Sequence, residues 1–217
     1  DFRISLWIPR LTIVLFSIAI CFAHFVRAAD TLRKYSDGPI VPGDFKAAVP
    51  DPTPVKDGIK LRAMTHTEIR YATRHRWDEA KTGTVTAWLT RFDCYAALLC
   101  DKCWIKEPMD VRLIDHEQGH FDITEINARR AQRKFDRLIA EKGLTGHGND
   151  EASAVADLNK QVRDQMQQVF DKEREEQIDY DRVTNHGRNH SAQAEQRRLQ
   201  HDRIKELDPK QPETIGK

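Results

Sequence analysis

The chain has 217 residues, of which 39% are hydrophobic and 32% are charged, so it has room for one ordinary domain with a leader segment and a modest core. Its 35 Lys and Arg residues almost balance its 34 Asp and Glu residues, which leaves a net charge of +1. This balance gives no reason to expect a nucleic-acid partner.

The first segment has the pattern of a secretory leader. Arg3 and Arg10 precede an apolar run over residues 11–23, and the small residues that follow suit cleavage after Ala28. The run is short for a hydrocarbon core about 30 Å thick, which favours a signal peptide over a membrane span. We therefore expect a signal peptide over residues 1–28 and a secreted or periplasmic protein. The alternative is an uncleaved anchor, which would be the chain's one membrane contact.

Residues 29–57 are rich in residues that restrict or break the backbone, so we expect an extended, partly mobile linker there. These residues are Gly38, Pro39, Pro42, Gly43, Pro50, Pro52 and Pro54. We expect the folded domain to span residues 58–190, and a charged C-terminal helix and tail to occupy residues 191–217.

Alternation of apolar and polar side chains after Gly58 predicts strands. Residues 59–64 alternate apolar and mainly basic types, and residues 68–72 continue the pattern. Residues 84–89 are rich in β-branched and aromatic types. We expect a small antiparallel sheet of three or four strands within about residues 58–106.

Three cysteines lie close together at the end of this region: Cys94, Cys100 and Cys103. Export permits disulfides, so we expect one local bridge, Cys94–Cys103 or Cys94–Cys100, linking a pair of strands. Cys100 and Cys103 form a CxxC pair, but no second CxxC completes a structural zinc site and no βαβ context supports a thioredoxin-like motif.

Two long helices are predicted next. The first covers about residues 107–142 and stops at Gly143, a residue typical of a helix C-terminus. The second begins at Asn149 or Asp150, either of which is a good N-cap. Its apolar residues recur at spacings of three and four, which is typical of a helix packed on a core: Val155, Leu158, Val162, Met166 and Val169.

A third helix, about residues 191–206, has almost no apolar positions, so we expect it to be peripheral or frayed. The pattern as a whole predicts an α+β fold. In it, the small antiparallel sheet (about residues 58–106) packs on the first long helix and on the second.

The first long helix contains His116-Glu117-x-x-His120, the HExxH pattern of zinc hydrolases. With about 3.6 residues per turn, side chains four apart lie on nearly the same face. Two imidazoles there could hold one Zn²⁺ at about 2.0–2.1 Å, leaving positions for a third protein ligand and a water. Glu117 could act as the general base that takes a proton from that water. Chance can also produce the pattern, as two surface histidines on a charged helix.

A third ligand must come from elsewhere in the chain. Glu125 lies roughly opposite the histidine pair on a continuous helix, and Glu141 lies at the tail of the same helix and could not fold back. His186 is a better candidate because it stands at a predicted helix break, where a loop can present its imidazole to another helix. His190, four residues further on, could compete with it, and both could instead be exposed loop histidines.

Two separated segments resemble a bacterial family of predicted secreted zinc-dependent proteases, long filed as a domain of unknown function. The segments are His116-Glu117-Gln118-Gly119-His120-Phe121-Asp122-Ile123, with Glu125 and Ala128-Arg129 following, and Tyr180-Asp181-x-x-Thr184-x-His186-Gly187. The resemblance covers about residues 58–190. It implies that His116, His120 and His186 bind zinc and that Glu117 is the general base.

Further polar residues near the motif have two interpretations each. Asp122 or Glu125 could accept the second N–H of a zinc-bound histidine, or could be a surface acid paired with Arg129 or Arg130. Tyr180 could donate to the oxyanion of a tetrahedral intermediate, or could be a packed residue near a helix end.

The sequence therefore predicts an exported zinc-dependent hydrolase, a peptidase that acts on a peptide or protein substrate. The first alternative is a hydrolase of cell-wall peptides or amides that uses the same site. The second is a non-catalytic periplasmic metal-binding or interaction protein, in which protein ligands fill every zinc position. A helical scaffold without metal is the third.

Overall fold

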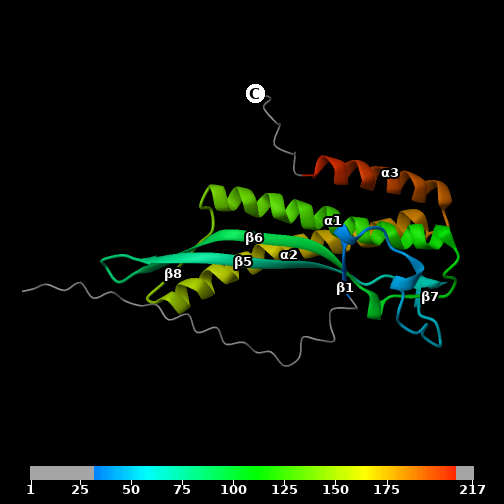
Figure 1. The fold of residues 1–217 in the computed structure, drawn as a ribbon, viewed down its shortest axis with the longest axis horizontal. Coiled ribbons are helices and arrows are strands. Elements are labelled where there is room, and N and C mark those ends of the chain that lie inside the picture. The colour runs from blue at the N-terminus through cyan, green and yellow to red at the C-terminus, as the bar shows by residue number, and fades with distance from the viewer. Residues whose placement is uncertain (1–31, 209–217) are drawn as a thin grey trace, which may run out of the picture. The chain divides into compact units, whose positions relative to one another are not determined.

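The computed structural model describes residues 32–208 (Figure 1). The expected signal peptide lies outside these residues. A long hairpin of β5 (Thr67–Glu79) and β6 (Val85–Leu99) packs against α1 (Val111–Ala140) and α2 (Glu151–Thr184), and α3 (His190–Glu206) lies along α1. The predicted α+β class is confirmed, with antiparallel strands packed against two long helices. Within residues 32–208, no helix is long and apolar enough to cross a membrane.

The main sheet has the order β1-β6-β5, and β8 (Thr145–Gly148) also pairs with β6. Its two long strands, β6 at the centre and β5 at the edge, are longer than the sequence pattern indicated. The register shifts between Arg74 and His75, which face Arg91 and Leu89, so Thr90 is left in a bulge. The bulge keeps Val85, Ala87 and Leu89 on the same buried face of β6 as Phe92, Ala96 and Leu98, although the strand contains one extra residue.

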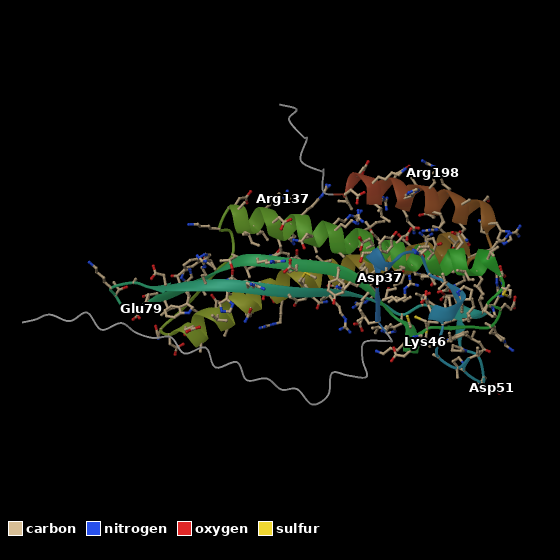
Figure 2. The ribbon with its side chains drawn as sticks, viewed as in Figure 1. Asp37, Lys46, Asp51, Glu79, Arg137 and Arg198 are labelled. Carbon is tan, nitrogen blue, oxygen red and sulfur yellow. The ribbon has the colours of Figure 1, made fainter. Side chains whose placement is uncertain are left out.

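The predicted strand over residues 59–64 is divided into two short strands in separate two-stranded sheets. β3 (Ile59–Lys60) pairs with β2 (Val55–Lys56), and β4 (Ala63–Met64) pairs with β7 (Trp104–Ile105). The β2–β3 hairpin turns at Asp57-Gly58, whose φ angles of 51° and 76° suit a two-residue type I′ turn. Figure 2 places Lys46 and Asp51 at the end of the domain where β7 lies, opposite Glu79 at the hairpin end.

The expected linker is part of the fold over the residues that the structure describes. β1 (Leu32–Lys34) pairs with the end of β6, and two short 3-10 helices follow it, η1 (Tyr35–Asp37) and η2 (Pro42–Asp44). The backbone N–H of Ile40 donates to Gln118 Oε1 at 2.6 Å. Residues 32–57 thus include two short strands and two 3-10 helices, and the partial mobility of this segment stays a prediction.

The core lies between the hairpin and the two long helices. The rings of Phe92 on β6 and Phe135 on α1 stack with centroids 3.9 Å apart. The apolar stripe of α2 faces this core, with Leu158, Val162 and Met166 buried as predicted. These buried residues set the rotation of α2 about its own axis. They therefore determine which face of its C-terminal half contacts α1.

Both long helices begin at aspartate caps. Asp110 accepts from the N–H groups of Arg112 and Leu113 at the start of α1, and Asp150 accepts from Ser153 N–H at the start of α2. α2 runs to Thr184, beyond the point where its apolar pattern fades. It ends in a left-handed turn that includes His186 and Gly187, with φ angles of 50° and 77°.

The expected disulfide is not formed. Cys94, Cys100 and Cys103 are all free thiols. Cys94 is five residues from the end of the extended strand β6, a distance of about 16 Å at about 3.3 Å per residue. A disulfide needs Cα atoms within about 7 Å, so Cys94 cannot reach either of the other two. Burial raises the pKa of Cys94 and of Cys103 to about 12, so both thiols stay protonated.

Candidate metal centre

Three side chains from two helices converge at one point. Nε2 of His116 and Nε2 of His120, both on α1, lie 3.3 Å and 3.1 Å from Oδ1 of Asp181 on α2. The three ligand atoms lie within 4.8 Å of one another, and the group is largely buried. His116, His120 and Asp181 could therefore hold a metal ion.

Gln177, one turn before Asp181 on α2, fixes the orientation of the His120 ring. Its amide nitrogen donates to the carbonyl oxygen of His120 at 3.0 Å, which turns its Oε1 toward Nδ1 of the ring at 2.5 Å. An amide oxygen can only accept, so Nδ1 carries the proton of a neutral ring. Nε2 then presents a lone pair to the Asp181 carboxylate. Two lone pairs 3.1 Å apart repel unless a proton or a metal cation lies between them.

The pKa shifts of Asp181 and His116 favour the forms that bind a cation, whereas the shift of His120 favours its protonated form until a cation displaces the proton. Burial would raise the pKa of Asp181, but hydrogen bonds from His116 and His120 hold it well below its usual range. Burial would lower the pKa of His120, but the Asp181 and Glu117 carboxylates outweigh burial and raise it. Burial lowers the pKa of His116, which favours its neutral form. An ionised carboxylate and a neutral imidazole are the forms that bind metals.

The ring of His116 is held by packing on both sides. Tyr180 stacks on one face, with centroids 4.9 Å apart and planes 13° apart. Gly187 covers the ring from the α2–α3 turn, where an added Cβ would lie 3.0 Å from Cγ of His116. Nδ1 of His116 is buried and has no hydrogen-bond partner within residues 32–208. Packing on both faces and the contact of Nε2 with Asp181 therefore orient this ring.

Tyr180 has the packing role rather than the oxyanion role. It is 2% exposed, its hydroxyl donates to the backbone carbonyl of His116 at 3.3 Å, and it does not line the cleft described below. Burial raises the pKa of its hydroxyl. The ring fits only because Gly119 has no side chain, since an added Cβ there would lie 2.8 Å from Cε1 of Tyr180. The second variable position of HExxH is thus a small residue for a packing reason.

Glu117 lies beside the histidines as the motif predicts. Its side chain accepts a hydrogen bond from the Thr65 hydroxyl, in the loop between β4 and β5. Glu117, His116, His120 and Asp181 line a cleft of about 300 Å³, which we call the metal cleft. Residues 59–67 form much of its wall. The general-base candidate and the candidate metal ligands thus face the same space.

His186 lies next to the cluster, where the sequence placed it. Its Nδ1 is 3.4 Å from Oδ1 of Asp181, and its Nε2 is 3.4 Å from Oδ2 of Asp57. The group that could hold a metal contains Asp181 rather than His186 as its third member. His190 is exposed, its Nδ1 lies 3.3 Å from Arg112, and it does not belong to that group. Of the two histidines proposed, only His186 lines the metal cleft.

No family model, curated protein or solved structure matches this chain. The resemblance to secreted zinc-dependent proteases therefore stays a prediction that rests on the motif residues.

The sequence missed the roles of Asp181, Gln177 and Lys56. Lys56 comes from the expected linker, and its Nζ lies 2.7 Å from Oδ2 of Asp181. A signal for the other two was present. Continuing the spacing of three and four beyond Val169 reaches residues on the face of α2 that meets α1: Glu173, Gln177, Tyr180, Asp181 and Thr184.

The two acids proposed as partners of a bound histidine have other contacts. Asp122 accepts from the Tyr35 hydroxyl at 3.0 Å and from Gln118 at 2.7 Å, and it pairs with Arg197 on α3. Glu125 pairs with Arg129 at 2.6 Å. Gln177 takes the role that was proposed for them. For Glu125 the structure agrees with the alternative of an acid paired with Arg129.

Proposed function

We propose that this protein is an exported zinc-dependent hydrolase that cleaves peptide bonds. The observation that carries the proposal is the meeting of the HExxH histidines with the Asp181 carboxylate in the cleft that also contains Glu117. Two imidazoles and one carboxylate are a donor set of catalytic zinc sites, in which a fourth position stays open. Export rests on the leader pattern of residues 1–28.

Each residue has a distinct role in this proposal. A bound zinc would lower the pKa of a water ligand to about 7 and polarise the substrate carbonyl. Glu117 accepts the proton of the attacking water and passes it to the leaving amine. The Thr65 hydroxyl keeps the Glu117 carboxylate in place. Gln177 holds the His120 ring with Nε2 toward Asp181, so that both could hold the ion.

The position of His186 favours one competing function. An imidazole 3.4 Å from Asp181 could supply a fourth protein ligand, and four protein ligands would make the zinc structural. That arrangement suits a non-catalytic metal-binding protein. It predicts that His186→Ala weakens zinc binding as strongly as His120→Ala does.

Metal content and hydrolysis together test the proposal. The purified protein should retain about one equivalent of zinc, and Asp181→Ala should lose it. Glu117→Gln should keep the zinc while hydrolysis of an unfolded protein falls at least about 100-fold, as expected for loss of a general base. Glu125→Gln is the matched control, because Glu125 is on the same helix but pairs with Arg129. Full hydrolysis by Glu117→Gln would refute the general-base role.

The substrate class needs a separate comparison. Unfolded proteins and cell-wall peptide fragments should be tested side by side with the zinc-loaded protein. Cleavage of the fragments alone would replace the peptidase proposal by the cell-wall hydrolase. Absence of cleavage of both, with zinc bound through His186, would favour the non-catalytic function.

A further inference from the structure

The metal cleft is lined by more cations than anions. Lys56, Lys60, Arg62 and Arg188 face it, against the two carboxylates of Glu117 and Asp181. This excess stands out because cations and anions almost cancel over the whole chain, at 35 against 34. Positive charge is therefore concentrated where a substrate would lie.

Two of these cations are already engaged. Lys56 pairs with Asp181 at 2.7 Å, and Arg62 pairs with Glu107 and with Asp110 at the start of α1. These contacts neutralise their charges within the fold. Lys56 and Arg62 are therefore structural rather than available to a ligand.

The other two cations, Lys60 on β3 and Arg188 after α2, are available. Both side chains are exposed, and neither has an ion-pair partner among residues 32–208. Of the two acids of the cleft, Asp181 pairs with Lys56, whereas Glu117 accepts only from the neutral Thr65 hydroxyl and keeps its charge. Lys60 and Arg188 therefore outnumber the one remaining carboxylate. A metal ion in the site would add further positive charge. The free charge of the cleft is thus positive.

The cleft is also shaped for a chain-like ligand. A second hollow adjoins it and shares Arg62, Leu113 and His186. Between the charges the wall is apolar, with Leu61 and Met64 on the side of β4. A small anion would need neither feature, whereas an extended peptide with apolar residues between acidic ones would use both.

We propose that the metal cleft selects acidic peptides, and that Lys60 and Arg188 are its specificity-determining residues. The inference rests on the proposed function, because it names the substrate class of the same site. Each exposed charge contact changes affinity by roughly two- to fivefold. Two such contacts should give about tenfold tighter binding of an acidic peptide than of its neutral counterpart. Salt should reduce the difference, because exposed charges are screened.

The test measures binding without cleavage. Zinc-loaded Glu117→Gln protein is titrated with three fluorescent peptides of equal length that share apolar residues and differ in carrying Glu, Gln or Lys between them. Fluorescence anisotropy should show the Glu peptide binding about tenfold tighter than the Gln peptide, and the Lys peptide weakest. The preference should shrink at high salt. Equal affinities, or no binding of any peptide, would overturn the proposal.

Variants in the same background identify the residues responsible. Lys60→Gln combined with Arg188→Gln should abolish the preference, and Lys60→Arg combined with Arg188→Lys should keep it. The control, Lys81→Gln with Arg76→Gln, makes the same charge change on the β5–β6 hairpin, away from the cleft. Thermal melts establish that each variant is folded. A preference that survives in the first pair would refute the assignment.

The outcome is separable from that of the proposed function. Wild-type protein that cleaves peptides with no charge preference would refute the specificity inference alone. Charge-selective binding without any cleavage by wild-type protein would refute the hydrolase and leave an acidic-peptide site.

Discussion

Gly119→Ala is expected to destabilise the protein, although alanine is the better helix former. An added Cβ would lie 2.8 Å from Cε1 of Tyr180 and closer still to Cζ and the hydroxyl oxygen. Carbon atoms normally pack about 3.5–4.0 Å apart, so the buried ring would have to move by about 1 Å. Overpacking of this kind costs about 1–3 kcal/mol, against about 1 kcal/mol gained in helix propensity.

The net loss should be up to about 2 kcal/mol, which lowers the melting temperature by up to roughly 8 °C in a domain of this size. Zinc affinity should fall as well, because the same ring stacks on His116. Urea unfolding of the zinc-free protein measures the first effect, and titration with zinc against a competing chelator measures the second.

A double-mutant cycle isolates the cause. Tyr180→Leu removes the three ring atoms nearest the added Cβ, so Gly119→Ala in that background should be neutral or stabilising by up to about 1 kcal/mol. An equal loss in both backgrounds would show that the clash with Tyr180 is not the reason for the glycine. A gain in the wild-type background would refute the packing of Tyr180 itself.

Gln177→Leu removes the hydrogen-bond acceptor of His120, so zinc affinity measured by chelator competition should fall about 10- to 100-fold. The control, Gln167→Leu on an exposed face of the same helix, should leave zinc affinity unchanged. Asp110→Ala should lower the free energy of unfolding by about 1 kcal/mol through loss of the N-cap. The hydrogen bond from Arg62 lowers the pKa of Asp110, so this stabilisation is present above the ordinary aspartate pKa and lost as pH falls through the lower folded value. The difference in unfolding free energy between wild type and Asp110→Ala should therefore be smaller at acid pH than at neutral pH. A difference that does not change with pH would contradict the ion pair. Phe135→Ala should cost about 3–5 kcal/mol in urea unfolding, and a loss under about 1 kcal/mol would contradict its place in the core.

The sequence predicts those parts of the site that depend on local spacing. His116, Glu117 and His120 lie on one stretch of helix, so the helical repeat alone brings them together. The two long helices and the hairpin strands also follow from local periodicity. The observed ends of these elements differ from the predicted ends because caps and bulges depend on single residues. Asp110 at the start of α1 and the extra residue Thr90 in β6 are examples.

The rest of the site depends on how distant elements pack. Asp181 reaches His120 across 61 positions of the chain, and only the rotation of α2 against α1 makes it the third member of the cluster. Lys56 belongs to a proline-rich segment that has no period from which to infer a partner. Composition indicated only a flexible segment, whereas in the structure Tyr35 and Ile40 contact α1 and Lys56 contacts α2.

The origin of the cluster from two helices has a consequence for folding. A metal ion held by His120 and Asp181 would act as a cross-link that closes a loop of 61 positions, and clips across long loops remove much chain entropy from the unfolded state. The ligands meet only after α1 and α2 have packed. Metal should therefore slow unfolding far more than it speeds folding. The ion would bind after the fold has formed and stabilise the native state, rather than nucleate folding.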